Sequence, residues 1–156
     1  MRHRPGCGGV AEVKRVIAAL PLLFVVLSGS APAPEPVHLE IALAGLRSTA
    51  GEVRLCIWHS PERFKRGKCE GDSRSIVVAA AETMVEVPLA PGDYAVSLVH
   101  DENGNGKLDK NLLGIPTEGV GFSQNPVLRF GPPSFAATRI DLAADTSETI
   151  RLKYFL

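Results

Sequence analysis

The residues of this chain whose types and spacing could do chemistry are concentrated between His100 and Asn125. Side chains with hard oxygen atoms recur there at relative positions 1, 3, 5 and 9, with glycine at position 6 and a backbone carbonyl at position 7. Ca²⁺ takes about six to eight such oxygens, and this spacing is that of the first part of an EF-hand loop. The segment therefore predicts a calcium site made by Asp101, Asn103, Asn105, Lys107 and Asp109.

The pattern departs from an EF-hand at two points. Position 12, where an EF-hand has a bidentate glutamate, is Leu112, and no helical pattern flanks the loop. Glu118 could supply a remote carboxylate if the loop folds back. With only Asp101 and Asp109 charged, we expect a weak site with a Kd of about 10⁻⁴–10⁻³ M. The alternative is a metal-free loop whose Asn and Asp side chains bond their own backbone as Asx turns do.

Acid–base catalysis is the other chemistry that this segment could support. His100 stands beside Asp101, and Asp109 and Glu118 follow it, so a hydrolase-like enzyme could use His100 with one of these carboxylates. The chain has neither a nucleophile-elbow motif nor an HExxH motif. We therefore expect a structural, hydrogen-bonded histidine and a non-enzymatic protein, with the hydrolase as the alternative.

The elements that must position this loop are predicted to be strands. Apolar and polar residues alternate in short segments bounded by Gly and Pro turns, and after residue 30 no helical period exceeds one turn. This pattern predicts an all-β fold, an antiparallel β-sandwich of about seven or eight strands, prealbumin-like or immunoglobulin-like. We expect the first two strands to pair as a hairpin. The expected strands span 37–44, 53–58, 76–80, 84–89, 94–98, 126–130, 136–142 and 149–155.

Three local signals add detail to this fold. Ser60 followed by Pro61 is a helix-start signal, and it predicts one helical turn inside the polar loop 59–75. Tyr94 follows a Pro-Gly turn, which favours a tyrosine corner whose hydroxyl returns to the turn backbone. Cys56 lies in a strand pattern and Cys69 in the loop after it, and we expect them to form a disulfide.

The N-terminal segment has the pattern of a secretory signal peptide. Basic residues precede an apolar run at 16–27, and small residues follow it, so we interpret 1–30 as a signal peptide. The alternative, a transmembrane anchor, needs about 20 apolar residues, and this run is shorter and contains Pro21. Residues 31–36 are a Pro-rich linker and 37–156 the sandwich domain. We therefore expect a secreted or periplasmic protein without a membrane span in its mature chain.

The net charge of the chain gives no indication of a nucleic-acid partner. The formal net charge of the whole chain is +0, and removal of 1–30 leaves a mildly acidic remainder. Nucleic-acid binding would need a concentrated basic field, so no nucleic-acid partner is expected. The remaining expectation is an unidentified protein or a ligand of the cell envelope.

The run HDENGNGKLDKNLLGIPTEGVGFSQN, following PGDYAVSLVHD, resembles the signature of a bacterial secreted family, domain of unknown function 2141. The resemblance covers about Val37 to Leu156. It implies a small, exported all-β protein and brings no established activity. Transthyretin-like hydrolases share a related fold, but their C-terminal Tyr-Arg-Gly-Ser signature is missing here.

Overall fold

The computed structural model describes residues 34–71, 73–129 and 131–155, and these residues form a mostly β unit with two sheets and two short helices. The predicted signal peptide, 1–30, and the first part of the predicted linker lie outside the described residues. No helix in the described part is long and apolar enough to cross a membrane. The ten elements are β1 (Val37–Ala44), β2 (Glu52–Trp58), α1 (Pro61–Arg66), β3 (Arg74–Ala79), β4 (Met84–Leu89), β5 (Gly92–Asp101), β6 (Gly119–Phe122), α2 (Phe135–Thr138), β7 (Ile140–Leu142) and β8 (Thr146–Arg151).

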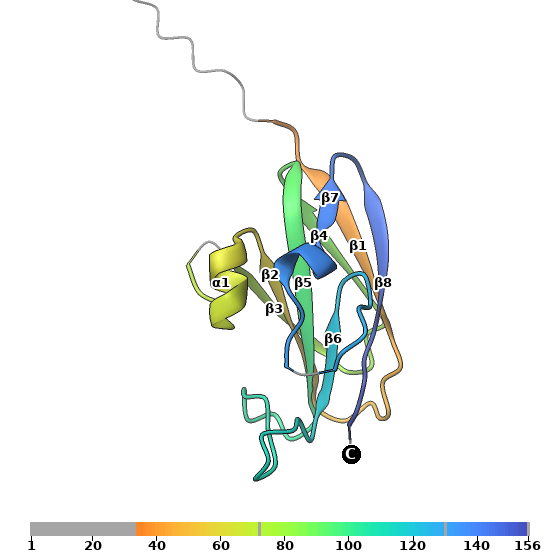
Figure 1. Cartoon of the computed structure of the whole chain (residues 1–156). Helices are drawn as coiled ribbons and strands as arrows, with labels where there is room; N and C mark the ends of the chain where they lie inside the picture. The colour runs from red at the N-terminus through yellow and green to blue at the C-terminus, as the bar shows by residue number, and fades with distance from the viewer. Residues whose placement is uncertain (1–33, 72, 130, 156) are drawn as a thin grey trace, which may run out of the picture. The chain divides into compact units, whose positions relative to one another are not determined.

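Two sheets enclose the main core. One has the strand order β4-β1-β8, and the other has the order β3-β2-β5-β6, with β7 pairing to β5 (Figure 1). Buried residues alternate along β1 from Leu39 to Leu43, as the pattern predicts, whereas β2 is buried on both faces from Leu55 to Trp58. Burying each such aliphatic side chain contributes about 1.5–3 kcal/mol. The two sheets meet in one cluster that includes Leu39, Ile41, Val53, Leu55, Val96, Leu98, Leu142 and Ile150.

A second, smaller apolar cluster lies on the other face of β2 and β5. Phe64 of α1 packs edge-on against Trp58 and against Phe135 of α2, with ring centroids 5.6 and 5.9 Å apart. Helix α1 begins where the sequence predicts a helical turn, with Ser60 as its N-cap and Pro61 in its first turn. The predicted disulfide forms between Cys56 and Cys69, whose Cα atoms are 5.9 Å apart. It ties the segment after α1 to β2.

The pairing of the first two strands differs from the expected hairpin. Strand β1 pairs with β4 in an antiparallel and with β8 in a parallel manner, whereas β2 pairs with β3 and β5 in the other sheet. The sheets are therefore not purely antiparallel. The prediction was wrong because both strands bury one face in the same core, and alternation is equally satisfied when the two strands stand in opposite sheets.

Three predicted strands toward the C-terminus also differ, and the last of them, expected at 149–155, is β8 at Thr146–Arg151. Residues 126–129 of the expected strand 126–130 are not in a strand, and the chain before them turns through positive φ at Gln124 and Asn125. The side chain of Asn125 accepts from Arg151 N–H and donates to the Thr149 carbonyl, so it occupies that edge of β8. The expected strand 136–142 begins as helix α2, capped by Ser134, and only Ile140–Leu142 is β7.

Candidate functional site

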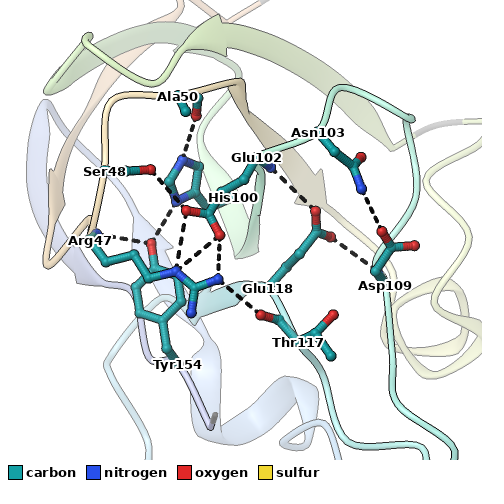
Figure 2. Close-up of polar contacts among 10 residues, drawn as sticks. All are labelled: Arg47, Ser48, Ala50, His100, Glu102, Asn103, Asp109, Thr117, Glu118 and Tyr154. Carbon is teal, nitrogen blue, oxygen red and sulfur yellow. Dashed lines mark hydrogen bonds and ion pairs between the residues drawn. The ribbon is translucent and has the colours of Figure 1, made fainter.

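The loop that the sequence singles out connects β5 to β6. His100 of β5 lies opposite Gly119 of β6 in an antiparallel register, so Asp101 and Glu118 leave the sheet side by side. This pairing supplies the fold-back that a contribution from Glu118 needs. Figure 2 shows Glu118 directed into the loop, between Glu102 and Asp109. Strand pairing therefore brings together residues that the sequence separates by a long, irregular segment.

We call residues 101–109 the Asx loop, because its Asp and Asn side chains bond the loop's own backbone. Asp101 is fully buried, and its two carboxylate oxygens accept from Asn105 N–H at 3.1 Å and Gly106 N–H at 2.7 Å. The Asn103 side-chain oxygen accepts from the same Asn105 N–H at 3.0 Å. The Asn105 side-chain oxygen accepts from Lys107 N–H at 2.8 Å. The oxygens of Asp101 and Asn103 thus meet at one backbone N–H group.

Asp109 closes the Asx loop from the other side. Its Oδ2 accepts from the side-chain amides of Asn103 at 2.7 Å and Asn105 at 2.9 Å. Two N–H groups thereby stabilise the negative charge of Asp109, as a cation bound next to that oxygen would. The four predicted side-chain ligands are brought together, and Gly106, at φ 76°, takes the left-handed conformation that the turn requires.

Glu118 fastens the two ends of the Asx loop. It is 4% exposed, and its carboxylate accepts from Glu102 N–H at 3.3 Å and from Asp109 N–H at 3.0 Å. These bonds satisfy backbone donors on both sides of the loop (Figure 2). Glu118 therefore holds the Asx loop closed whether or not its carboxylate also contacts a ligand.

His100 lies beneath the loop and is fully buried. Its Nε2 lies 2.9 Å from the Ala50 carbonyl, which can only accept, so Nε2 carries a proton. Nδ1 lies 2.6 Å from the Tyr154 hydroxyl and, in the neutral ring, accepts from it. The two ring nitrogens are thus hydrogen-bonded to Ala50 and Tyr154, one each, and not to the carboxylates of the loop.

An ion pair that the sequence pattern did not indicate lies beside Tyr154, the hydrogen-bond partner of this histidine. The Arg47 guanidinium bonds both carboxylate oxygens of Glu102, donates to the Thr117 carbonyl at 3.1 Å, and lies 4.5 Å from the centre of the Tyr154 ring (Figure 2). Ser48 donates a further hydrogen bond to Glu102 at 2.8 Å. The Arg47 side chain therefore links the β1–β2 connection, the Asx loop and the segment after β8.

The ionisation of these groups follows from their contacts. The hydrogen bond from Arg47 is the largest cause that lowers the pKa of Glu102, and the Ser48 hydrogen bond and the charge of Arg47 lower it further, against partial burial. The same bond to Glu102 raises the pKa of Arg47. Burial raises the pKa of Tyr154 above its usual value of 10.0. At neutral pH the pair is therefore charged and the phenol retains its proton.

The oxygen atoms of the Asx loop fit a hard cation better than a soft one. Carboxylate, amide and carbonyl oxygens suit Ca²⁺, whereas zinc sites are built mainly from imidazole and thiolate ligands. Within the described residues, no group of three or more His, Cys, Asp and Glu side chains could hold a metal ion. Neutral asparagine amides would therefore have to complete any cation site here, which favours weak binding.

The comparison with known proteins identifies a family. A model of the bacterial family described as "Uncharacterized protein conserved in bacteria (DUF2141)" matches residues 41–151, a range that contains Arg47, His100 and the Asx loop. No curated protein and no solved structure matches the chain. The match confirms the resemblance carried by the motif from His100 to Phe122. Because it covers more than half of the chain, the protein belongs to this bacterial family, domain of unknown function 2141.

Proposed function

We propose that this protein is exported and acts in the cell envelope as a non-enzymatic binding or structural module, and that its Asx loop binds Ca²⁺ weakly. The convergence of Asp101, Asn103, Asn105 and Asp109 in one loop is the observation that carries the proposal. Long loops on a rigid β scaffold are a common place for binding sites. The two sheets and their shared core provide such a scaffold, for which we propose a prealbumin-like or immunoglobulin-like β-sandwich.

The ion would be held by the side-chain oxygens of Asp101, Asn103, Asn105 and Asp109 and by the Lys107 carbonyl. When bound, Ca²⁺ supplies positive charge and cross-links the loop; it supplies no reaction. Asn103 and Asn105 must then turn their oxygens toward the ion, and the bonds of their amide N–H groups to Asp109 are lost. Because this exchange costs existing hydrogen bonds, we expect a Kd of about 10⁻⁴–10⁻³ M.

Two features support export. The basic, apolar and small-residue pattern of 1–30 is that of a signal peptide. The bond between Cys56 and Cys69 suits an oxidising compartment, because thiols are kept reduced in the cytosol. Mass spectrometry of the protein recovered from a bacterial host tests this part: a cut near residue 30 supports it, and an intact N-terminus contradicts it.

A binding role is favoured over the hydrolase-like alternative by the surroundings of His100. A general base needs a ring nitrogen that a substrate can reach, whereas both nitrogens of this buried ring are engaged. The experiment is a panel of ester, amide and glycoside substrates with the wild type and a folded His100→Gln variant. The proposal expects no turnover by either; turnover that the variant loses would support the hydrolase.

Calcium titration tests the binding role. We expect heat of binding at millimolar Ca²⁺ and a higher melting temperature, with about 1.4 kcal/mol of stabilisation at ten times the Kd. Asp109→Asn keeps the side-chain size and should weaken binding, whereas Asp141→Asn, an exposed aspartate on β7, is the matched control. If the wild type gives neither heat nor a melting shift, the Asx loop is a metal-free structural loop.

A further inference from the structure

The loop beyond the Asx loop ends in an exposed apolar tip. Leu112 is fully exposed and Leu113 is 82% exposed, and Ile115 follows at 37%. Figure 1 shows the loop between β5 and β6 extending away from the end of the sheets. Adjacent leucines in full contact with water are costly, and exposed apolar groups of this kind mark interaction sites. We call residues 111–115 the leucine tip.

Four of the five backbone N–H groups of the leucine tip, all but that of Leu112, donate within the tip. The side-chain oxygen of Asn111 accepts from Leu113 N–H at 2.9 Å and Ile115 N–H at 3.0 Å, and the Asn111 carbonyl accepts from Gly114 N–H at 2.9 Å. These hydrogen bonds, all within residues 111–115, hold the backbone of the tip in its folded conformation. Backbone groups that already have partners lose little when they leave water, which is the requirement for entering an apolar phase.

The base of the leucine tip is held by hydrogen bonds and carries two exposed lysines. Lys110 and Pro116 form an antiparallel bridge, Asn111 N–H donates to the Ile115 carbonyl, and Thr117 N–H donates to the Asp109 carbonyl at 3.0 Å. Lys110 and, nearer the sheet, Lys107 are exposed. Asp109, the acidic side chain between them, already accepts two amide N–H groups. The exposed apolar side chains of the tip and the two exposed lysines beside it complement a lipid bilayer, which has an apolar interior and can carry anionic headgroups.

Size distinguishes a lipid surface from a protein groove as the partner. A stable protein interface takes about 20–30 residues on each side, and the leucine tip offers three aliphatic side chains. A bilayer needs no matching pocket, because aliphatic side chains can insert between the lipid headgroups at any point of its surface. We propose that the leucine tip inserts into the surface of a bilayer that contains anionic phospholipids, with Lys107 and Lys110 at the headgroups.

This inference rests on the proposed function in one respect: both take the loop between β5 and β6 as the part of the protein that binds a ligand or partner. It does not require Ca²⁺, so vesicle binding is measured in the presence of a chelator. The protein is recovered from the periplasm of a bacterial host, and every variant must have the same N-terminus by mass spectrometry. A retained apolar segment at 16–27 would otherwise bind vesicles itself.

The experiment is co-sedimentation with vesicles of phosphatidylcholine, alone or mixed with phosphatidylglycerol. The wild type should bind the mixed vesicles more tightly. Leu112→Ser/Leu113→Ser should lower the partition coefficient about 100-fold or more, since each leucine is worth at least about tenfold. Lys107→Gln/Lys110→Gln should lower binding to mixed vesicles about 25-fold and leave phosphatidylcholine binding unchanged.

The control is Met84→Ser/Val127→Ser, which removes two exposed apolar side chains outside the leucine tip, 49% and 77% exposed. It should bind as the wild type does, and melting curves should show that all variants fold. Absence of wild-type binding to both vesicles overturns the inference and leaves a protein as the partner. Equal binding by the leucine variant and the wild type also overturns it. Vesicle binding without a calcium response contradicts only the calcium proposal. A calcium response without vesicle binding contradicts only the membrane proposal.

Discussion

The hydroxyl of Tyr154 lies 2.6 Å from Nδ1 of His100, and this contact joins the segment after β8 to the end of β5 across 54 residues. The same hydroxyl accepts from Arg47 N–H at 3.2 Å, and the Arg47 guanidinium covers the Tyr154 ring. The base of the Asx loop is therefore anchored by a histidine and a tyrosine from distant parts of the chain. This anchoring gives the loop a fixed origin on the sheet.

Tyr154→Phe should destabilise the protein by about 1–3 kcal/mol, because it leaves His100 Nδ1 without its donor in a fully buried ring. Urea unfolding measures the loss. Tyr94→Phe is the matched control: its hydroxyl donates to the carbonyl of Ala90, an exposed residue whose oxygen can take water instead. A loss for Tyr154→Phe no larger than that for Tyr94→Phe would contradict the anchoring role.

Glu102 should make stability depend on pH in the acid range. Because the Arg47 hydrogen bond and charge lower its folded pKa below the ordinary value of 4.5, its contribution is present above about pH 4.5. It is lost as the pH falls through the lowered folded pKa. Glu102→Gln should therefore be less stable than the wild type at pH 7, and the difference should narrow below about pH 4.5. Urea unfolding across this range, with the exposed Glu82→Gln as control, measures the effect; a constant difference argues against it.

Gly119→Ala should destabilise the protein by about 1–3 kcal/mol. A Cβ there would lie 2.5 Å from two ring carbons of Tyr154, so the ring that binds His100 must move. A double-mutant cycle with Tyr154→Ala isolates the clash, since adding Gly119→Ala to that variant should cost much less. Equal costs in the two backgrounds would show that the tyrosine ring is not what excludes a side chain at residue 119.

Loss of the bond between Cys56 and Cys69 should cost about 3 kcal/mol, because the closed loop has a sequence separation of 13. Thermal unfolding of the oxidised wild type, the reduced wild type and Cys56→Ala/Cys69→Ala measures this. The last two should melt together and below the first. The Asx loop should keep its calcium response in all three, since the disulfide joins β2 to the segment after α1.

Alternation of apolar residues predicted which side chains of β1, β2, β4 and β5 point into the main core, because successive side chains of a strand point to opposite faces. It could not predict the partner of each strand. Leu39 and Leu55 pack in the same core from opposite sheets. The alternation of apolar residues in each strand would be the same whichever sheet the strand joined. The expected hairpin failed for this reason.

Strand β6 was missed because two of its four residues are glycines, which leave no alternation to detect. Its pairing is nevertheless tight: a Cβ on Gly121 would lie 3.0 Å from a methyl group of Ile150. Glycine at this position is explained by the close approach of β8. Only the packed structure reveals that reason.

The candidate site was predictable as far as its residues are local in sequence. The spacing of Asp101, Asn103, Asn105 and Asp109 indicated a loop of converging oxygens, and these side chains do converge. Arg47 and Tyr154, which are 107 residues apart, follow no local spacing that could have indicated their contact. Long-range pairs of this kind are set by strand order, which the sequence pattern leaves open.

The central claim is that the Asx loop binds Ca²⁺, and nitrogen-15 NMR of the exported protein during a calcium titration tests it most directly. We predict shifts confined to residues 101–118, including the side-chain amides of Asn103 and Asn105, with a Kd of about 10⁻⁴–10⁻³ M. Asp109→Asn should weaken these shifts and Asp141→Asn should leave them unchanged. Side-chain amide signals of Asn103 and Asn105 that stay in place at saturating Ca²⁺ would contradict the account.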